Sequence, residues 1–194
     1  MTNLPLNGQI AVTAAYGQKG SMDLWRPDGV HKGIDLISRE NKDDIYSTCD
    51  GTVRVVAWDA EGWGQYVSIG DAQGRKHIFA HMVQGSVKLK AGDSVTRSTV
   101  IGLMGNTGRS TGKHLHYQIN DSDDKPVDPT AWLHIPNMTG NYSSADYQVD
   151  ASGELTGKST APVPAPQPQP EKKTVTWAEA GEILRKAGYT GVEL

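Results

Sequence analysis

Between Gln9 and about Leu133 the chain is divided by turn residues into short apolar segments, a pattern that leaves little room for helices. The segments are rich in β-branched or aromatic residues and end at Gly, Asp or Asn, with turn signals roughly every eight to twelve residues. Apolar heptads typical of helices are absent from the first two thirds of the chain. We therefore predict an all-β domain, whose strands lie within the segments 9–17, 31–38, 44–51, 52–59, 64–71, 75–82 and 114–121.

The chain of 194 residues is long enough for one well-buried domain and a tail. We predict a β domain over 1–137, ending in one helical turn in "DPTAWL", and a disordered Pro/Gln-rich linker over 138–173. A short C-terminal helical element over 174–194 follows, with a capping-box pattern at Thr176 and Glu179. Because an isolated helix of this length is marginal in water, three roles stay open: docking on another surface, dimerisation or binding to a cell wall.

The charge pattern excludes several function classes. With 19 basic and 22 acidic residues and no basic stripe, the chain lacks the footprint of a nucleic-acid-binding protein. No apolar stretch is long enough to span a membrane, and the N-terminus has neither the basic region nor the apolar region of a signal peptide. We therefore expect synthesis in a cytoplasm without a signal peptide. The single cysteine, Cys49, excludes an internal disulfide and a Cys-based zinc cluster.

Two histidines one residue apart stand out in "GKHLHYQI". Alternate side chains of a strand point to the same face, so His114 and His116 would lie together there. Such a pair suits a metal or a proton-transfer site. Taken alone, it is equally consistent with two exposed histidines on a half-solvated sheet.

A second pattern, "HKGIDL", places His31 and Asp35 on one face of an extended segment, because they are an even number of residues apart. Gly33 between them leaves that face open for the approach of a ligand or another backbone. Together with the histidine pair, these residues supply two imidazoles and a carboxylate. Such a set suits a catalytic zinc ion with one coordination position left open.

A third pattern, "HIFAHM", contains His77 and His81 four residues apart, so their even spacing predicts that both lie on one face of a strand. One of them could reach the metal site as an acid/base group. His134 has no motif around it, and we interpret it as structural.

These motifs resemble the LytM/lysostaphin-type zinc metallopeptidases, peptidase family M23, which cut the peptide part of bacterial peptidoglycan. The resemblance covers roughly residues 5–135 and includes "HKGIDL", "DGTVRVV", "IFAHM", "VKLKAGDSV", "IGLMGNTGRSTGKHLHYQI" and "VDPTAWL". It implies an antiparallel β-barrel-like groove, built on a duplicated hybrid motif. It also implies a zinc-dependent endopeptidase that cleaves peptide stem or cross-bridge bonds, with peptidoglycan as the partner.

Carried over residue by residue, the resemblance makes His31, Asp35 and His116 the ligands of one zinc ion and His81 and His114 the catalytic pair. It assigns no substrate-binding residues and does not determine which bond is cut. Phe and Met stand in "IFAHM" where the family commonly has Tyr and Leu, and Lys113 stands where Pro is frequent. These changes could alter the groove wall.

The organisation of the chain is similar to that of a phage or prophage endolysin, released through a holin or carried on a virion. Two other functions stay open. A non-catalytic relative could act as a cell-wall binding or activating partner, although such proteins typically lack one or more of the five site residues. The segment "VKLKAGDSVTRSTVIGLMG" also resembles biotinyl or lipoyl carriers and sugar phosphotransferase subunits, but the modifiable lysine of a carrier is missing.

Overall fold

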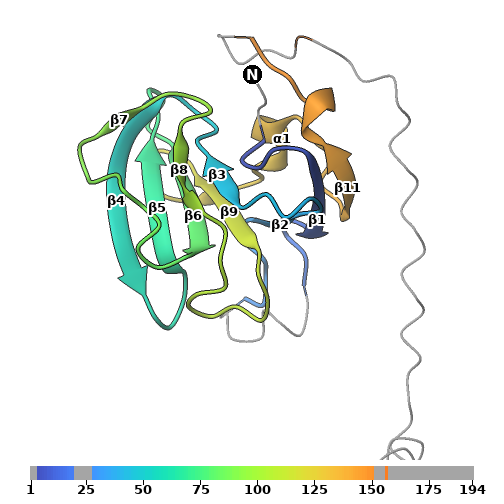
Figure 1. Cartoon of the computed structure of the whole chain (residues 1–194), viewed down its shortest axis with the longest axis horizontal. Helices are drawn as coiled ribbons and strands as arrows, with labels where there is room; N and C mark the ends of the chain where they lie inside the picture. The colour runs from blue at the N-terminus through green and yellow to red at the C-terminus, as the bar shows by residue number, and fades with distance from the viewer. Residues whose placement is uncertain (1–3, 20–27, 151–155, 157–194) are drawn as a thin grey trace, which may run out of the picture. The chain divides into compact units, whose positions relative to one another are not determined.

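The computed structural model describes residues 4–19, 28–150 and 156, and in these residues almost all regular structure is antiparallel β-sheet (Figure 1). Within the described ranges the helical elements are single turns, α1 (Thr130–Leu133) and η2 (Ser144–Asp146). The strands are β1 (Gln9–Ala14), β2 (Ile34–Ser38), β3 (Asp44–Tyr46), β4 (Gly51–Asp59), β5 (Gly64–Gly70), β6 (Lys76–Met82), β7 (Ser94–Val95), β8 (Val100–Leu103), β9 (Leu115–Asn120), β10 (Pro126–Val127) and β11 (Gly140–Ser143). The predicted all-β class is confirmed, and no helix among the described residues is long and apolar enough to cross a membrane.

Nine strands form one sheet in the order β11-β1-β2-β9-β6-β5-β4-β7, with β10 paired to β9, and β3 and β8 form a separate ribbon. Strand β9 lies between β2 and β6, as Figure 1 shows. All six of its residues are buried, so both faces of β9 are covered. Successive side chains of a strand alternate between the two faces of the sheet, so His116 and Tyr117 point to opposite sides.

The face that carries Tyr117 packs into the hydrophobic core. Phe79 of β6 is directly opposite Tyr117 in the sheet, and their rings are 5.1 Å apart. Both side chains have no exposed area. The core is completed by apolar residues of the strands, of α1 and of the segment before β1, chiefly Leu4, Leu6, Ile10, Ile34, Leu36, Ile45, Ile69, Met82, Ile101, Leu115 and Leu133.

A buried polar group interrupts this core at His77. Its Nδ1 accepts a hydrogen bond from the Tyr117 hydroxyl at 2.8 Å, and its Nε2 lies 3.3 Å from the carboxylate of Asp71. Thr48 Oγ1 lies 2.7 Å from the same Tyr117 hydroxyl. Burial lowers the pKa of His77 to about 4, although Asp71 opposes that shift. His77 is therefore neutral at physiological pH.

This buried histidine predicts a loss of stability in acid. The unfolded chain takes up a proton near pH 6.5 and the folded chain near pH 4, so the contribution of His77 is complete above pH 6.5 and is lost as the pH falls. We expect the free energy of unfolding to fall by about 3 kcal/mol between pH 7 and pH 4 through this group. Urea unfolding of the chelator-treated protein measures it, with His77→Gln as the comparison. Equal pH dependence of the two proteins would contradict the assignment.

The predicted end of the β domain at residue 137 is too early. Strand β11 pairs with β1 in antiparallel register, with Tyr142 opposite Ile10. Tyr142 is 5% exposed and Val149 is 2% exposed, so this segment contributes to the core. The prediction failed because isolated apolar residues among polar and small ones do not show a sequence-local strand pattern. The rest of the predicted linker and the helical element over 174–194 lie almost entirely outside the described residues.

Candidate metal centre

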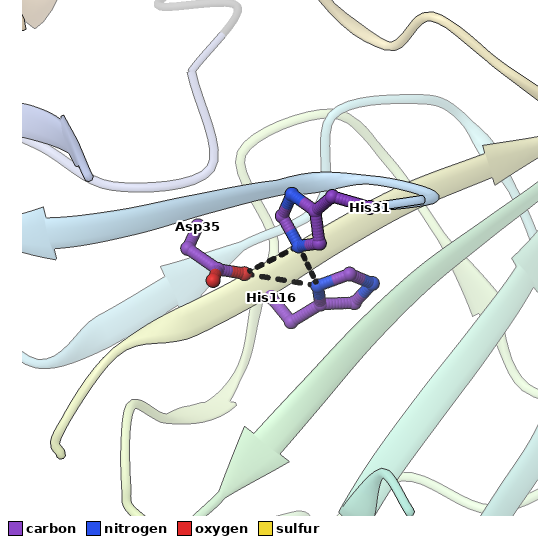
Figure 2. Close-up of side chains that lie close together, drawn as sticks. All are labelled: His31, Asp35 and His116. Atoms are coloured by element: carbon purple, nitrogen blue, oxygen red, sulfur yellow. Dashed lines mark hydrogen bonds and ion pairs between the residues drawn. The ribbon is translucent and has the colours of Figure 1, made fainter. Parts of the chain in front are cut away.

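Three side chains meet above β2 and β9: His31, Asp35 and His116 (Figure 2). Asp35 and His116 are direct partners across the β2–β9 ladder, so the register of these two strands brings them together. His31 precedes β2 by three residues, and its ring reaches back over the same face. Asp35 Oδ1 lies 2.9 Å from His116 Nδ1 and 3.1 Å from His31 Nε2, and the two nitrogens are 3.1 Å apart.

Backbone contacts determine how His31 faces the cluster. Its own N–H donates to the carbonyl of Gln18, and its carbonyl accepts from Gly17. The ring nitrogen Nδ1 lies 3.0 Å from the carbonyl oxygen of Ala15. A carbonyl oxygen only accepts, so neutral His31 carries its proton on Nδ1 and presents the lone pair of Nε2 to Asp35.

The donor set fits a zinc ion. Burial raises the pKa of Asp35, but the imidazoles of His116 and His31, which donate hydrogen bonds to the carboxylate when they are protonated, outweigh that effect and hold the pKa of Asp35 well below its usual value. The carboxylate is therefore ionised at neutral pH. The edges of a zinc tetrahedron measure roughly 3.3–3.4 Å at ordinary ligand distances, close to the 2.9–3.1 Å between these donors. Two imidazoles and one carboxylate are a typical set for catalytic zinc.

Gly33 is required where the segment before β2 passes over His116. A Cβ atom at this position would lie 2.4 Å from the carbonyl oxygen of Tyr117 and 2.8 Å from Cε1 of the His116 ring. The face that the sequence predicts to be open at Gly33 is therefore occupied by the backbone of Tyr117 and by the His116 ring.

Gly33→Ala is expected to lower the free energy of unfolding by about 1–3 kcal/mol, because the β2–β9 ladder must give way to the methyl group. The displaced His116 ring should also weaken zinc binding. Urea unfolding of the metal-free protein and a zinc titration measure the two effects. Gly112→Ala is the control, because a Cβ there meets nothing within 4 Å. Unchanged zinc affinity in Gly33→Ala would contradict this account.

His81 reaches the cluster through a β-bulge. The register between β5 and β6 shifts between the pairs Gln65–Met82 and Val67–Phe79, and His81 adopts a φ of 61°. An extra residue of this kind re-aims a side chain. Its ring centroid lies 4.7 Å from that of His114 and 6.0 Å from that of His116.

The bulge overturns the predicted common face for His77 and His81. His77 contacts Tyr117 in the core, whereas His81 lies beside His114 and His116 on the other side of β9. An even spacing predicts one face only while a strand stays regular.

Hydrogen bonds hold both of these imidazoles. His81 Nδ1 lies 2.8 Å from the carbonyl oxygen of Thr107, and His114 Nδ1 lies 2.8 Å from that of Gly112. Thr107 is itself fixed, because its hydroxyl donates to the carbonyl of Met82 at 2.6 Å. Neutral His81 and His114 thus carry their protons on Nδ1 and leave Nε2 as an acceptor.

The electrostatic setting favours the neutral form of His81. Burial, and next the charge of protonated His114, lower the pKa of His81 to about 4. His114 Nε2 lies 3.7 Å from Asp35 Oδ1, so it borders the cluster directly. The structure therefore places an acceptor nitrogen of His114 beside the three donors.

The three residues that differ from the pattern of the resembled family are not among the converging residues His31, Asp35 and His116. Phe79 and Met82 are fully buried in the hydrophobic core. Lys113 forms an ion pair with Asp43 at 2.5 Å. Phe79 and Met82 therefore do not form a groove wall by direct exposure. His134 is exposed and lies at the end of α1.

Sequence reasoning missed several residues that touch the site histidines, among them Thr107 and Gln118. Thr107 holds His81, and Gln118 Oε1 lies 3.3 Å from His116 Nε2. The two-residue step from His116 to Gln118 was a usable signal, because it predicts one face of β9. No sequence pattern pointed to Thr107, whose loop meets β6 only in the folded chain.

Comparison with known proteins bears on what this cluster does. The sequence model "Peptidase family M23" matches residues 29–129. The DD-carboxypeptidase/endopeptidase Mpg of Neisseria meningitidis is 31% identical over 132 residues, which are 68% of this chain and 29% of that protein. Endolysin 2638A of Staphylococcus phage 2638A is 33% identical over 100 residues, or 50% of this chain and 20% of the endolysin. The chain thus spans less than a third of the length of these curated relatives.

Among solved structures, a zinc-containing peptidase from Vibrio cholerae aligns with a TM-score of 0.54 and 28% identity. The alignment covers 66% of this chain and 38% of that one. The fold around the cluster is therefore shared with a peptidase described as containing zinc.

Proposed function

Because the chain belongs to peptidase family M23, we propose that it is a zinc-dependent endopeptidase that cleaves peptide stem or cross-bridge bonds of bacterial peptidoglycan. The observation that carries the proposal is the convergence of His31 Nε2, Asp35 Oδ1 and His116 Nδ1 within 3.1 Å of one another. His81 and His114 complete the constellation on the same side of β9.

The three converging residues would hold one zinc ion. Zinc would supply the Lewis acidity that activates water and polarises the carbonyl of the scissile bond. Asp35 contributes a negative charge to the site, and the two ligand imidazoles bind in their neutral forms. The site is backed by the ladder between β2 and β9, which keeps the donors of Asp35 and His116 at a fixed separation.

His81 and His114 would move the protons. Each neutral ring presents Nε2 as an acceptor, because a backbone carbonyl holds the proton on Nδ1. One of these nitrogens can take the proton of the attacking water, and the protonated ring can then stabilise the oxyanion and donate a proton to the leaving amine. No other acid/base side chain is needed for this sequence of proton transfers.

The similarity to Mpg and to an endolysin supports a bacterial cell wall as the site of action. Within this proposal the protein is a phage or prophage lysin, released through a holin or carried on a virion. The similarity to Endolysin 2638A, over half of this chain, is what supports a phage source. The C-terminal element over 174–194 would dock, dimerise or bind the wall.

Mass spectrometry of digested sacculi tests the function. Purified sacculi with direct and with glycine-containing cross-links are incubated with the protein, and a His116→Ala protein serves as the blank. New free amines in the wild-type digest alone, lost with a chelator and restored by zinc, identify the peptidase and its bond. Intact cross-links with zinc-loaded protein would refute the peptidase and favour a non-catalytic binding or activating partner.

A further inference from the structure

A row of buried polar side chains runs along β9 away from the metal cluster. His116, Gln118 and Asn120 are two residues apart and share one face of the strand. They are 2%, 5% and 8% exposed. His116 Nε2 lies 3.3 Å from Gln118 Oε1, and Gln118 Nε2 donates to Asn120 Oδ1 at 2.7 Å.

The residues at the far end of the row determine which way its side-chain amides are turned. Asn120 Nδ2 lies 2.9 Å from the carboxylate of Asp124 and 3.3 Å from its backbone carbonyl. Lys76 Nζ lies 2.9 Å from the same carboxylate. Because an ionised carboxylate and a carbonyl accept hydrogen bonds and cannot donate, Asn120 must present its amide nitrogen to Asp124. Its Oδ1 then faces Gln118.

The orientation passes along the row to His116. Since Asn120 Oδ1 only accepts, Gln118 must turn its amide nitrogen toward Asn120 and its Oε1 toward His116. A proton on His116 Nε2 satisfies that oxygen. Neutral His116 with its proton on Nε2 has none on Nδ1, the atom that faces Asp35 and His31. The ionised carboxylate of Asp35, 2.9 Å from Nδ1, is the acceptor that competes for this proton in the metal-free protein.

We propose that Gln118, oriented by Asn120 and Asp124, is the positioning residue that holds His116 in the tautomer with a free Nδ1 lone pair. The inference rests on the proposed function, because it gives that lone pair to zinc. The Ala15 carbonyl similarly holds the proton of neutral His31 on Nδ1, so that the Nε2 lone pair of His31 faces the cluster. With the two rings in these tautomers, three lone-pair atoms face one another, an arrangement that favours a cation between them.

The first test observes the tautomer without any metal. Long-range nitrogen–proton correlation spectra of the chelator-treated protein at pH 7.5 report which ring nitrogen of His116 carries the proton, with assignment from the His116→Ala spectrum. We expect an Nε2-protonated population in the wild-type protein and a smaller one in Gln118→Leu, which has no acceptor for that proton. Equal Nε2-protonated populations in the two proteins would overturn the proposal.

The second test is zinc affinity, measured by competition with a chelating dye. We expect Gln118→Leu to bind zinc about 10–100-fold more weakly, the range typical of partners that orient a metal ligand. Gln118→Glu keeps an acceptor oxygen and should restore most of the affinity. Asn120→Ala frees the Gln118 amide to turn and should give a smaller loss than Gln118→Leu.

Ile78→Val is the matched control, because Ile78 lies opposite Gln118 on β6 and is 3% exposed but forms no part of the row. In this variant the His116 tautomer and the zinc affinity should equal those of the wild-type protein. Thermal unfolding of each metal-free variant shows that it is folded. Equal losses in Gln118→Leu, Gln118→Glu and Ile78→Val would overturn the proposal in favour of a packing effect.

The outcomes separate this inference from the proposed function. A wild-type protein that binds no zinc but shows the Nε2 tautomer, lost in Gln118→Leu, supports the orientation by Gln118 and refutes the metallopeptidase. A wild-type protein that binds zinc tightly, with Gln118→Leu equal to it, refutes the role of Gln118 and leaves the proposed function standing.

Discussion

His116→Ala is expected to abolish stoichiometric zinc binding and to lower peptidoglycan cleavage by at least about 1000-fold. The substitution removes one of three converging donors and leaves Asp35 with His31 alone. Stabilisation by a metal Lewis acid amounts to several kcal/mol, and each 1.4 kcal/mol corresponds to about tenfold in rate. Elemental analysis after dialysis measures the zinc content, and release of free amines from sacculi measures the activity.

The control for this variant is His134→Ala, which makes the same substitution at an exposed histidine away from the cluster. It should retain one zinc ion per chain and wild-type activity. Circular dichroism checks that His116→Ala keeps its β structure, since the ring is buried. If His116→Ala kept full zinc content and more than a tenth of the activity, the ligand assignment would be wrong.

His81→Ala and His114→Ala should each lower kcat by about 100-fold to 10 000-fold and leave zinc bound, because a positioned acid/base group contributes on that scale. Their Nδ1 atoms are held by the backbone carbonyls of Thr107 and Gly112, so Nε2 is the atom that would exchange protons under the proposed function. If the two rings act as a unit, the double variant should be little slower than the slower single variant.

The readout for this pair is kcat on a soluble cross-linked peptide, measured beside the zinc content of the same sample. Loss of zinc together with activity would contradict a role limited to proton transfer. A change in KM with kcat unchanged would instead indicate that the ring contacts substrate, because such a change reports uniform binding. His134→Ala again provides the control.

The alternation of side chains along extended segments was sufficient to predict much of this site. The HxH pattern predicted that His114 and His116 share a face, and both lie beside Asp35 in the structure. The even spacing in "HKGIDL" likewise predicted the meeting of His31 and Asp35, although the segment before Ile34 is not part of β2. Side-chain direction along an extended chain is a local property, so these predictions needed no partner strand.

Other features depend on contacts between distant segments. His81 points to the cluster because β6 bulges against β5, where its N–H donates to the carbonyl of Trp63. Residues around Tyr142 belong to the fold because β11 adds to the edge of β1. Neither event leaves a periodic signal, since a bulge and an edge pairing are decided by the register of the partner strand.

The sequence by itself therefore determined the all-β class and the residue types that suit a metal, because alternation and turn chemistry act over a few residues. Only the tertiary structure decided that the segments carrying His31, His81 and His116 meet, and which nitrogen of each ring faces the cluster. His116 and Asp35 are separated by 81 residues, and the β2–β9 register alone sets their donors 2.9 Å apart. The contact between His31 Nδ1 and the Ala15 carbonyl oxygen joins residues that are 16 apart in the sequence and forms only in the folded chain, because directional contacts require the partner to be in place.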